Sequence, residues 1–313
     1  MVMVNSRIAV LWDSEVDWQG DEPFKKDYIN NSYSVFSEIA SERGSEVVIG
    51  KFSWYEDKLT KGYCFRDGEW VKVEDISIDG IFDKFKFDDE TIDLKRKMHS
   101  QLPVLNSFEL EEVCKDKLKT YEEFPKHVPE TQVAEKQNVE EMLEEDERVV
   151  LKPRYDFGGK GVKVIDNIGD FQSEEDLLVQ RFVDSSTGIQ DLGIEGVHDL
   201  RVIVVDDEPA TSFVRTPDEG FISNVSRGGS MHHFEIEEIP EEALKIAEEV
   251  DEGFSHLGHR VYAVDFIFDS DGKPWILEMN SKPGLVFYDD EDVRSWKEPL
   301  MEKVVDNLLR MVD

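Results

Sequence analysis

Residues 261–285 constrain the fold of this chain more than any other segment. Residues 261–268 are apolar and rich in β-branched and aromatic side chains, and residues 275–279 resume the same pattern after Asp271 and Gly272. Two apolar runs separated by an Asp-Gly turn predict a pair of antiparallel strands joined by a tight hairpin.

Three polar residues interrupt this hairpin: Asp265 on the first strand, and Glu278 and Asn280 on the second. A carboxylate inside a buried strand is costly unless a positive group compensates for it. If the strands pair, the three side chains could together offer oxygen ligands to magnesium that carries a nucleotide phosphate. The alternative is that Asp265 and Glu278 face solvent on an edge hairpin, and this segment alone does not decide between the two.

The chain is strongly acidic, with 71 Asp and Glu against 36 Lys and Arg in 313 residues and a formal net charge of -35. This balance disfavours nucleic acid as a partner, because nucleic-acid binding depends on neutralising phosphates. The acidic residues are dispersed along the chain, which predicts a halophilic surface. The 23 lysines against 13 arginines fit that interpretation less well.

The two cysteines, Cys64 and Cys114, lie far apart in the sequence, and no Cys or His pair has metal-ligand spacing. This pattern predicts a reduced, cytoplasmic protein. The first residues lack a secretory signal pattern, and no segment approaches ~20 consecutive apolar residues. We therefore expect no membrane partner.

Strand and helix patterns alternate over the first hundred residues, which predicts an open α/β domain. It lacks the GxGxxG turn of a dinucleotide-binding domain. The predicted elements of this part are strands at 7–12, 46–52 and 80–85, a helix at 28–43 and a hairpin at 63–73. Further along, we predict helices at 109–124, 138–147 (capped by Asn138), 240–257 and 296–311, and strands at 149–153, 162–165, 177–183, 200–205 and 210–216.

Residues 149–164, VVLKPRYDFGGKGVKV, place a glycine-rich loop between two strands. Glycines let a backbone approach a polyphosphate closely and present N–H groups to it. Lys152 and Lys160 flank the loop as cations, although no GK[ST] follows as in a P-loop. A plain hairpin turn is the alternative interpretation. The loop glycines are Gly158, Gly159 and Gly161.

Arg201 and Arg215 fall at inward positions of two predicted strands, among apolar residues. One such arginine is commonly part of a structural ion pair, whereas two on neighbouring strands favour an anionic ligand. Residues 221–230, FISNVSRGGS, add a polar loop with Asn224 and Arg227. This loop could close over an active site and exclude water, or it could be an ordinary surface loop.

Taken in order, these motifs resemble the ATP-grasp superfamily: DKLKT from Asp116, VVLKP with FGGKGV, LLVQRFV, DLRVIVV, FVRT, SNVSRGG, AVDF and LEMNSKPG. The last three are most similar to the ribosomal-protein glutamate ligases and the lysine-biosynthesis ligases, and glutathione synthetases are more distant. The resemblance covers residues 114–286. The chain departs from the pattern at Arg181, Ile222 and Lys282, and by an insertion at 184–197.

The resemblance implies an ATP-grasp fold, of α/β class with α+β lobes. Its three expected domains are an open α/β pre-ATP-grasp domain at 1–113, a nucleotide-binding lobe at 114–184, and a C-terminal lobe with the metal and substrate sites at 185–313.

The same resemblance implies a site for each reaction component. The residues expected to bind ATP are Lys117, Lys152, Gly158, Gly159, Lys160, Gly161, Gln180, Arg181, Phe182 and Val183. Those expected to hold two magnesium ions, with manganese as the alternative ion, are Asp265, Glu278 and Asn280. The expected catalytic residues are Arg201, Arg215, Asn224 and Arg227, and the expected substrate-binding residues are Arg227, Ser281, Lys282 and Gly284.

By resemblance, the activity would be that of an ATP-dependent carboxylate–amine ligase that forms an amide through an acylphosphate. The expected substrates are a small-molecule or peptide carboxylate and an amine, and the expected assembly is a homodimer or homotetramer. A small-molecule kinase and a catalytically silent nucleotide-binding module are the alternatives. The sequence does not identify the acid or the amine.

Overall fold

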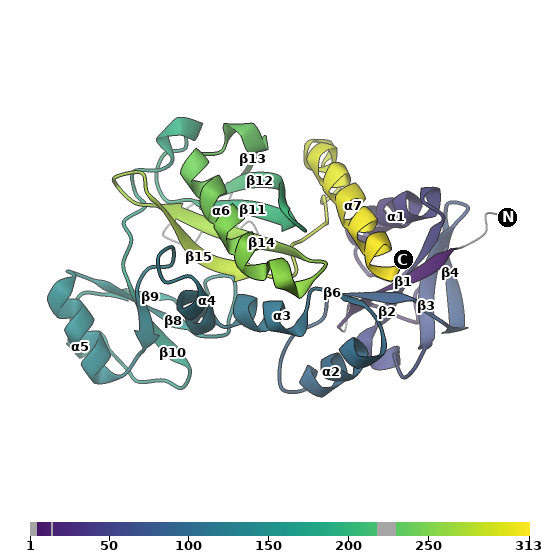
Figure 1. Ribbon diagram of the computed structural model, residues 1–313, viewed down its shortest axis with the longest axis horizontal. Coiled ribbons are helices and arrows are strands. Elements are labelled where there is room, and N and C mark those ends of the chain that lie inside the picture. Colours follow the sequence, from purple (N-terminus) through teal and green to yellow (C-terminus); the bar gives the residue numbers. More distant parts are fainter. Residues whose placement is uncertain (1–4, 14, 218–229) are drawn as a thin grey trace. The chain divides into compact units, whose positions relative to one another are not determined.

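The computed structural model describes residues 5–13, 15–217 and 230–313, and the chain forms two compact units (Figure 1). Unit 1 comprises Met1–Phe108, His256–Val261 and Lys282–Asp313. Unit 2 comprises Glu109–Ser255 and Tyr262–Ser281. None of the described helices is long and apolar enough to cross a membrane.

Unit 1 is built on a six-stranded sheet of order β4-β3-β2-β1-β5-β6, in which β1 pairs in parallel with both β2 and β5. Its strands are β1 (Ser6–Trp12), β2 (Ser45–Lys51), β3 (Leu59–Arg66), β4 (Glu69–Ile76), β5 (Gly80–Asp83) and β6 (Val104–Leu105). Its helices are α1 (Asp27–Glu42), α2 (Ile92–Gln101) and α7 (Glu291–Val312).

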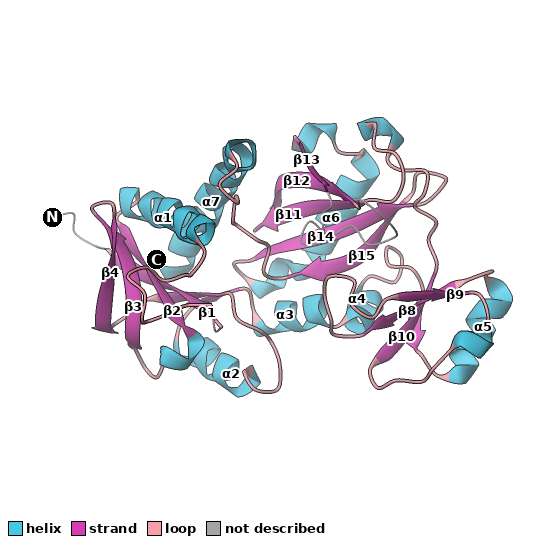
Figure 2. Ribbon diagram, turned by 180° about the vertical axis from the view of Figure 1, so that it is seen from behind, coloured by secondary structure: helices cyan, strands magenta, loops and turns pink. Residues whose placement is uncertain are grey.

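The central strand β1 is apolar from Ile8 onward because helices cover both faces of the sheet. Ala9 and Leu11 pack with Met98 of α2 on one face. On the other face, α1 and α7 contact the strands, as the view in Figure 2 shows. The structure thus confirms the predicted open α/β arrangement of this part of the chain. The predicted turn between β3 and β4 is also confirmed, with Asp67 and Gly68 both at positive φ.

Unit 2 contains two sheets, of order β7-β10-β8-β9 and β13-β12-β11-β14-β15. The first sheet consists of β7 (Thr131–Val133), β8 (Val149–Pro153), β9 (Lys163–Ile165) and β10 (Leu177–Arg181). The second consists of β11 (Asp199–Val205), β12 (Glu208–Thr216), β13 (Ser230–Phe234), β14 (Val261–Phe268) and β15 (Pro274–Asn280). The helices of this unit are α3 (Phe108–Lys115), α4 (Lys117–Glu123), α5 (Lys136–Glu145) and α6 (Glu241–Phe254).

The alternation of side chains along β8 and β10 separates a core face from a polar face. Val149, Leu151 and Val179 belong to an apolar cluster that also contains Val139 and Met142 of α5. Successive strand residues point to opposite faces, so the neighbouring positions on β8 and β10 lie on the other side of the sheet. Those positions carry the polar residues described below.

One predicted helix was wrong, because the segment 109–124 forms two helices with a break at Asp116. Asp116 has extended backbone angles, and its carboxylate accepts hydrogen bonds from the backbone N–H groups of Leu118 and Lys119. An aspartate that caps a helix in this way favours a new start over continuation. The apolar periodicity continues across Asp116, and for this reason the sequence pattern predicted a single helix.

The predicted cap of α5 was also wrong. The helix begins at Lys136 after Glu135, so Asn138 lies within its first turn. The Asn138 side chain donates instead to the carbonyl of Val133, at 2.9 Å. The predicted last helix begins earlier than expected, at Glu291, because the Asp290 carboxylate caps it.

Candidate active site

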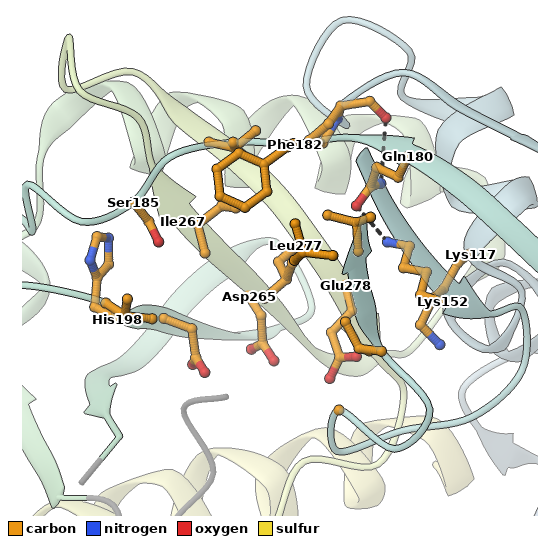
Figure 3. A pocket seen from close by; sticks show the side chains of 18 of the residues that line it. Lys117, Lys152, Gln180, Phe182, Ser185, His198, Asp265, Ile267, Leu277 and Glu278 are labelled. Carbon is orange, nitrogen blue, oxygen red and sulfur yellow. Dashed lines mark hydrogen bonds between the residues drawn. The ribbon is translucent and has the colours of Figure 1, made fainter. Parts of the chain in front are cut away.

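A cavity in unit 2 is lined by residues from both of its sheets (Figure 3). It brings together most of the side chains that the sequence singles out. The predicted site residues that line it are Lys117, Lys152, Gly158, Gly159, Lys160, Gln180, Arg181, Phe182, Val183, Arg215, Asp265 and Glu278.

The strand pair β14–β15 places two acids side by side. Asp265 lies directly opposite Glu278 in the strand register, followed by an irregularity between Asp265 and Phe266. Asp265 has no exposed surface, so the solvent-facing alternative is wrong for this residue. In Figure 3 both carboxylates point into one end of the cavity, whereas the apolar side chains of Phe182 and Leu277 lie toward the other.

Two arginines contact the buried Asp265. Arg201 donates from Nε to Oδ1 at 2.6 Å, and Arg215 donates from Nη2 to Oδ2 at 2.9 Å. Arg215 also donates from Nε to Asp199 Oδ1 at 2.7 Å. Both arginines are therefore ion-paired within the site, and Arg215 in addition lines the cavity.

The pKa values of the two facing acids are shifted in opposite directions. Burial alone would raise the pKa of Asp265, but the guanidinium groups of Arg201 and Arg215 outweigh it and lower that pKa. Burial, and then the negative charge of Asp265, raise the pKa of Glu278. A cation placed between the two carboxylates would reverse the shift of Glu278, because an opposite charge favours the ionised form.

The donor set fits a hard cation that is completed by other oxygen ligands. In the described parts of the chain, no group of three or more His, Cys, Asp and Glu residues could hold a metal ion. Asp265 and Glu278 therefore supply two carboxylates, and an ion here would need further oxygens, such as those of a phosphate. The third predicted ligand, Asn280, ends β15 and is not among the residues that line the cavity.

Lysines occupy the face of the first sheet that lines the cavity. Lys152 Nζ donates to Gln180 Oε1 at 2.8 Å, and the two residues are diagonal neighbours on β8 and β10. Burial, and then the charge of Lys117, lower the pKa of Lys152 to about 7. Burial also lowers the pKa of Lys117. Because both ammonium groups are buried, an anionic ligand would stabilise their charged forms.

The loop between β8 and β9 has the conformation that its glycines permit. Gly158, Gly159 and Gly161 all have positive φ, in a range that L side chains rarely adopt. A Cβ on Gly161 would lie 2.8 Å from Pro153 Cγ. The loop joins the antiparallel strands β8 and β9, and Gly158 and Gly159 line the cavity whereas Gly161 does not.

Arg181, one of the positions where the sequence departs from the pattern of its resemblance, has a structural role. Its guanidinium forms ion pairs with Glu145 and Asp146 at the end of α5, each at 3.0 Å. Its backbone N–H donates to the carbonyl of Glu130 at 2.9 Å. The arginine therefore ties the β10 segment to neighbouring elements.

The remaining predicted residues lie elsewhere. Ser281 ends unit 2 without lining the cavity, and Lys282 and Gly284 belong to unit 1. The predictions for Asn224 and Arg227 fall outside the described residues.

Several residues that line the cavity were not predicted from the sequence, among them Ser185, His198 and Asp199. Asp199 could have been found, since it precedes Arg201 by two positions and therefore shares a strand face with it. His198 and Ser185 carry no such signal. The ring of His198 is fixed by the backbone, because its Nε2 accepts from Phe268 N–H at 3.2 Å and its Nδ1 lies 3.0 Å from the Gly196 carbonyl.

Comparison with protein families decides the classification. The family model described as the ATP-grasp domain of prokaryotic glutathione synthetase matches residues 116–274, just over half of the chain. The chain belongs to the ATP-grasp superfamily. A second family model, of the tubulin-tyrosine ligase family, matches residues 238–312 of this ATP-grasp protein.

Individual relatives agree with this placement. A tetrahydromethanopterin:alpha-L-glutamate ligase of Methanocaldococcus jannaschii is 28% identical over 176 residues, which are 52% of this chain and 55% of that protein. The ATP-grasp chain therefore matches about half the length of this curated relative.

Solved structures share the fold. An ATP-grasp protein with a RimK domain from Sphaerobacter thermophilus has a TM-score of 0.61 at 17% identity, covering 97% of this chain and 100% of that chain. The ATP-grasp ligase PsnB, complexed with a phosphomimetic variant of its minimal precursor, Mg and ADP, has a TM-score of 0.59 at 12% identity and covers 99% and 100%. The predicted α/β ATP-grasp fold is confirmed.

Proposed function

We propose that this protein is an ATP-dependent carboxylate–amine ligase. One observation carries the proposal: a single cavity holds two partly desolvated lysines, a glycine loop at positive φ, and two facing carboxylates beside an arginine. Its membership of the ATP-grasp superfamily supports ATP as the nucleotide.

In this proposal the apolar end of the cavity takes the adenine and the polar end takes the phosphates. Residues 180–183, which line the cavity, would lie along the base, with the Phe182 ring at the apolar end (Figure 3). Lys117 and Lys152 would contact phosphate oxygens. A bound phosphate would raise the pKa of Lys152 again, because an opposite charge favours the ammonium form.

Asp265 and Glu278, with Asn280, would hold magnesium, and two ions are proposed. The metal would supply neutralisation of charge on the phosphoryl group that is transferred. For Asp265 to serve as a ligand, it must share its oxygens between the metal and the arginines that now contact it.

The proposed chemistry has two steps. A carboxylate oxygen of the acid attacks the γ-phosphorus, the bond from phosphorus to the bridging oxygen breaks, and ADP leaves. The amine nitrogen then attacks the acyl carbon, the carbon–oxygen bond breaks, inorganic phosphate leaves, and the amine releases its proton to solvent. Arg215 and Arg201 would stabilise the charge on the transferred group, and positioning supplies much of the rest.

The substrates in this proposal are a small-molecule or peptide carboxylate and an amine. The named relatives include a glutamate ligase and a ligase complexed with its precursor. The division at 1–113, 114–184 and 185–313, the cytoplasmic setting, the halophilic surface and the homodimer or homotetramer stay predictions that accompany it.

A turnover screen tests the proposal. The protein is incubated with ATP and magnesium in molar potassium chloride, together with pooled amino acids, peptides and di-acids, and free phosphate and product mass are measured. We expect phosphate release together with a product formed by condensation of an acid and an amine. A phosphorylated product without free phosphate would instead make the protein a kinase, and the Asp265→Asn variant serves as the inactive control.

A further inference from the structure

A buried threonine of unit 2 extends the polar face of its first sheet. Thr131 is the first residue of β7, and its cross-strand partner on β10 is Gln180. Gln180 is in turn a diagonal neighbour of Lys152 on β8. Because paired residues share a face of a sheet, the strand register brings the three side chains together, and all three are buried.

The hydrogen bonds among these side chains fix the orientation of the Gln180 amide. Thr131 Oγ1 donates its one proton to the carbonyl of Pro129 at 2.8 Å, so its oxygen accepts from Gln180 Nε2, at 2.7 Å. The amide oxygen of Gln180 then faces Lys152, whose Nζ donates to it at 2.8 Å (Figure 3). A turned amide would take the hydroxyl proton away from Pro129. It would also point its N–H groups at an ammonium, which has no acceptor.

This orientation matters because Lys152 is withdrawn from water. Burial, and then the charge of Lys117, lower the pKa of Lys152 to about 7. Among the described residues, Gln180 Oε1 is the side-chain atom to which the Lys152 ammonium donates. An acceptor at this point fixes the place of the ammonium and favours its charged form.

We propose that Thr131 is a positioning residue of the nucleotide site, which holds the Gln180 amide so that its oxygen fixes the Lys152 ammonium where phosphate oxygens bind. This inference rests on the proposed function, in which Lys152 contacts the phosphates of ATP. Thr131 itself does not line the cavity, so it acts through Gln180. A preformed site requires such a second layer of side chains, which locks the groups that touch the ligand.

Nucleotide binding by the whole protein tests the role of Thr131. The β,γ-imido analogue of ATP is titrated by calorimetry, with magnesium, into the wild type, Thr131→Val and Thr131→Ser. Valine lacks the hydroxyl, so the Gln180 amide loses its fixed orientation and the Kd should rise about tenfold or more. Serine keeps the hydroxyl, so the Kd should stay within about threefold of the wild type.

Thr211→Val is the matched control. Thr211 is also a buried strand threonine of unit 2 with a hydrogen-bonded hydroxyl, and it does not line the cavity. Its Kd should stay within about threefold of the wild type. An unchanged Kd in Thr131→Val, or an equal rise in Thr211→Val, would overturn the inference.

A carboxylate at position 180 separates positioning from a merely structural role. Gln180→Glu carries an oxygen at both ends of the group, so no neighbour is needed to orient it. In this background, Thr131→Val should change the Kd by less than about threefold. An equal rise in both backgrounds would show that Thr131 only supports the fold, and would overturn the inference.

Gln180→Met guards against a Thr131→Val variant that does not fold. Methionine is a flexible side chain without an oxygen acceptor for Lys152, so the Kd should again rise about tenfold or more. An unchanged Kd would overturn the inference, because Thr131 acts on Lys152 only through Gln180.

Turnover separates this inference from the proposed ligase. Amide formation by the wild type, with a Kd of the analogue that Thr131→Val leaves unchanged, would overturn the inference and leave the ligase standing. The expected pattern of Kd values, with no product from any acid and amine, would leave the inference standing and overturn the ligase. An analogue that the wild type does not bind would overturn both.

Discussion

Arg201 holds Asp265 through two parallel hydrogen bonds, with Nε 2.6 Å from Oδ1 and Nη2 2.5 Å from Oδ2. Both residues are buried, so the pair is a fixed part of the site. The acid proposed as a metal ligand is thus also the counter-ion of a neighbouring arginine. Because of this double role, we expect substitution of Asp265 to lower the free energy of unfolding more than substitution of its strand partner Glu278.

Asp265→Asn is expected to abolish turnover and also to lower the free energy of unfolding by about 3 kcal/mol, because it leaves the Arg201 charge buried without its carboxylate. The ion pair of Asp265 with Arg201 is the reason for this loss of stability. Urea unfolding measures the loss, and a second substitution, Arg201→Met, should recover part of it. Full stability of Asp265→Asn would show that the ion pair contributes nothing.

Glu278→Gln is expected to abolish turnover while changing the free energy of unfolding by less than about 1 kcal/mol. The reason is that burial, and then the charge of Asp265, raise the pKa of Glu278, and glutamine keeps the size of this side chain without its charge. Parallel assays of phosphate release and urea unfolding test this. Near-normal activity in both this variant and Asp265→Asn would contradict the metal assignment.

The buried Lys152 predicts a dependence of stability on pH. Its pKa is about 7 in the folded protein and about 10.4 when unfolded, so between these values the unfolded chain binds more protons. Stability should therefore rise with pH in this window, by at most about 1.4 kcal/mol per pH unit for this group. Lys152→Met should reduce the gain between pH 7 and pH 9, measured by chemical unfolding. The control is Lys160→Met, because Lys160 is exposed. An equal gain in stability between pH 7 and pH 9 in both variants would contradict the lowered pKa of Lys152.

Asp116 is expected to position Lys117 through two interactions. Its carboxylate caps α4 and binds Arg154 through two hydrogen bonds of 2.7 and 2.6 Å. Asp116→Ala should lower the free energy of unfolding by about 2 kcal/mol and raise the KM for ATP with less effect on kcat. Asp116→Asn keeps a capping side chain and should lose less stability. If the two variants lose equal stability, the helix cap makes no measurable contribution to the free energy of unfolding.

The net charge of -35 predicts a strong response to salt. Screening reduces repulsion among surface carboxylates, so the Tm should rise between dilute buffer and molar potassium chloride. Thermal unfolding in a potassium chloride series measures this, with sucrose at matched osmolality as the control. A flat Tm would remove the halophilic interpretation.

Patterns that repeat over several residues could be predicted from the sequence. The paired strands β14 and β15 follow from two apolar runs around an Asp-Gly turn, and Gly272 in that turn has a φ of 82°. The placement of Lys152 beside the glycine loop follows in the same way. In these segments local propensity and the final fold agree.

Features that depend on one side chain, or on contacts distant in sequence, could not be predicted. The break at Asp116 depends on a single carboxylate that finds two backbone N–H groups and Arg154. The ion pairing of Arg201 joins residues 64 positions apart.

Unit 1 is built from three separate segments of the chain, and this determines the order in which the two units can fold during synthesis. Unit 2 has all of its residues once position 281 has been synthesised, whereas unit 1 still lacks α7. That helix buries Leu300, Val304 and Leu308, and Val312 comes so near to Gly80 that a Cβ there would clash with it. Because a ribosome delivers residues in sequence, the strands begun first are the last to be enclosed. Until then the apolar face of β1 and β5 is open to chaperones and to other nascent chains.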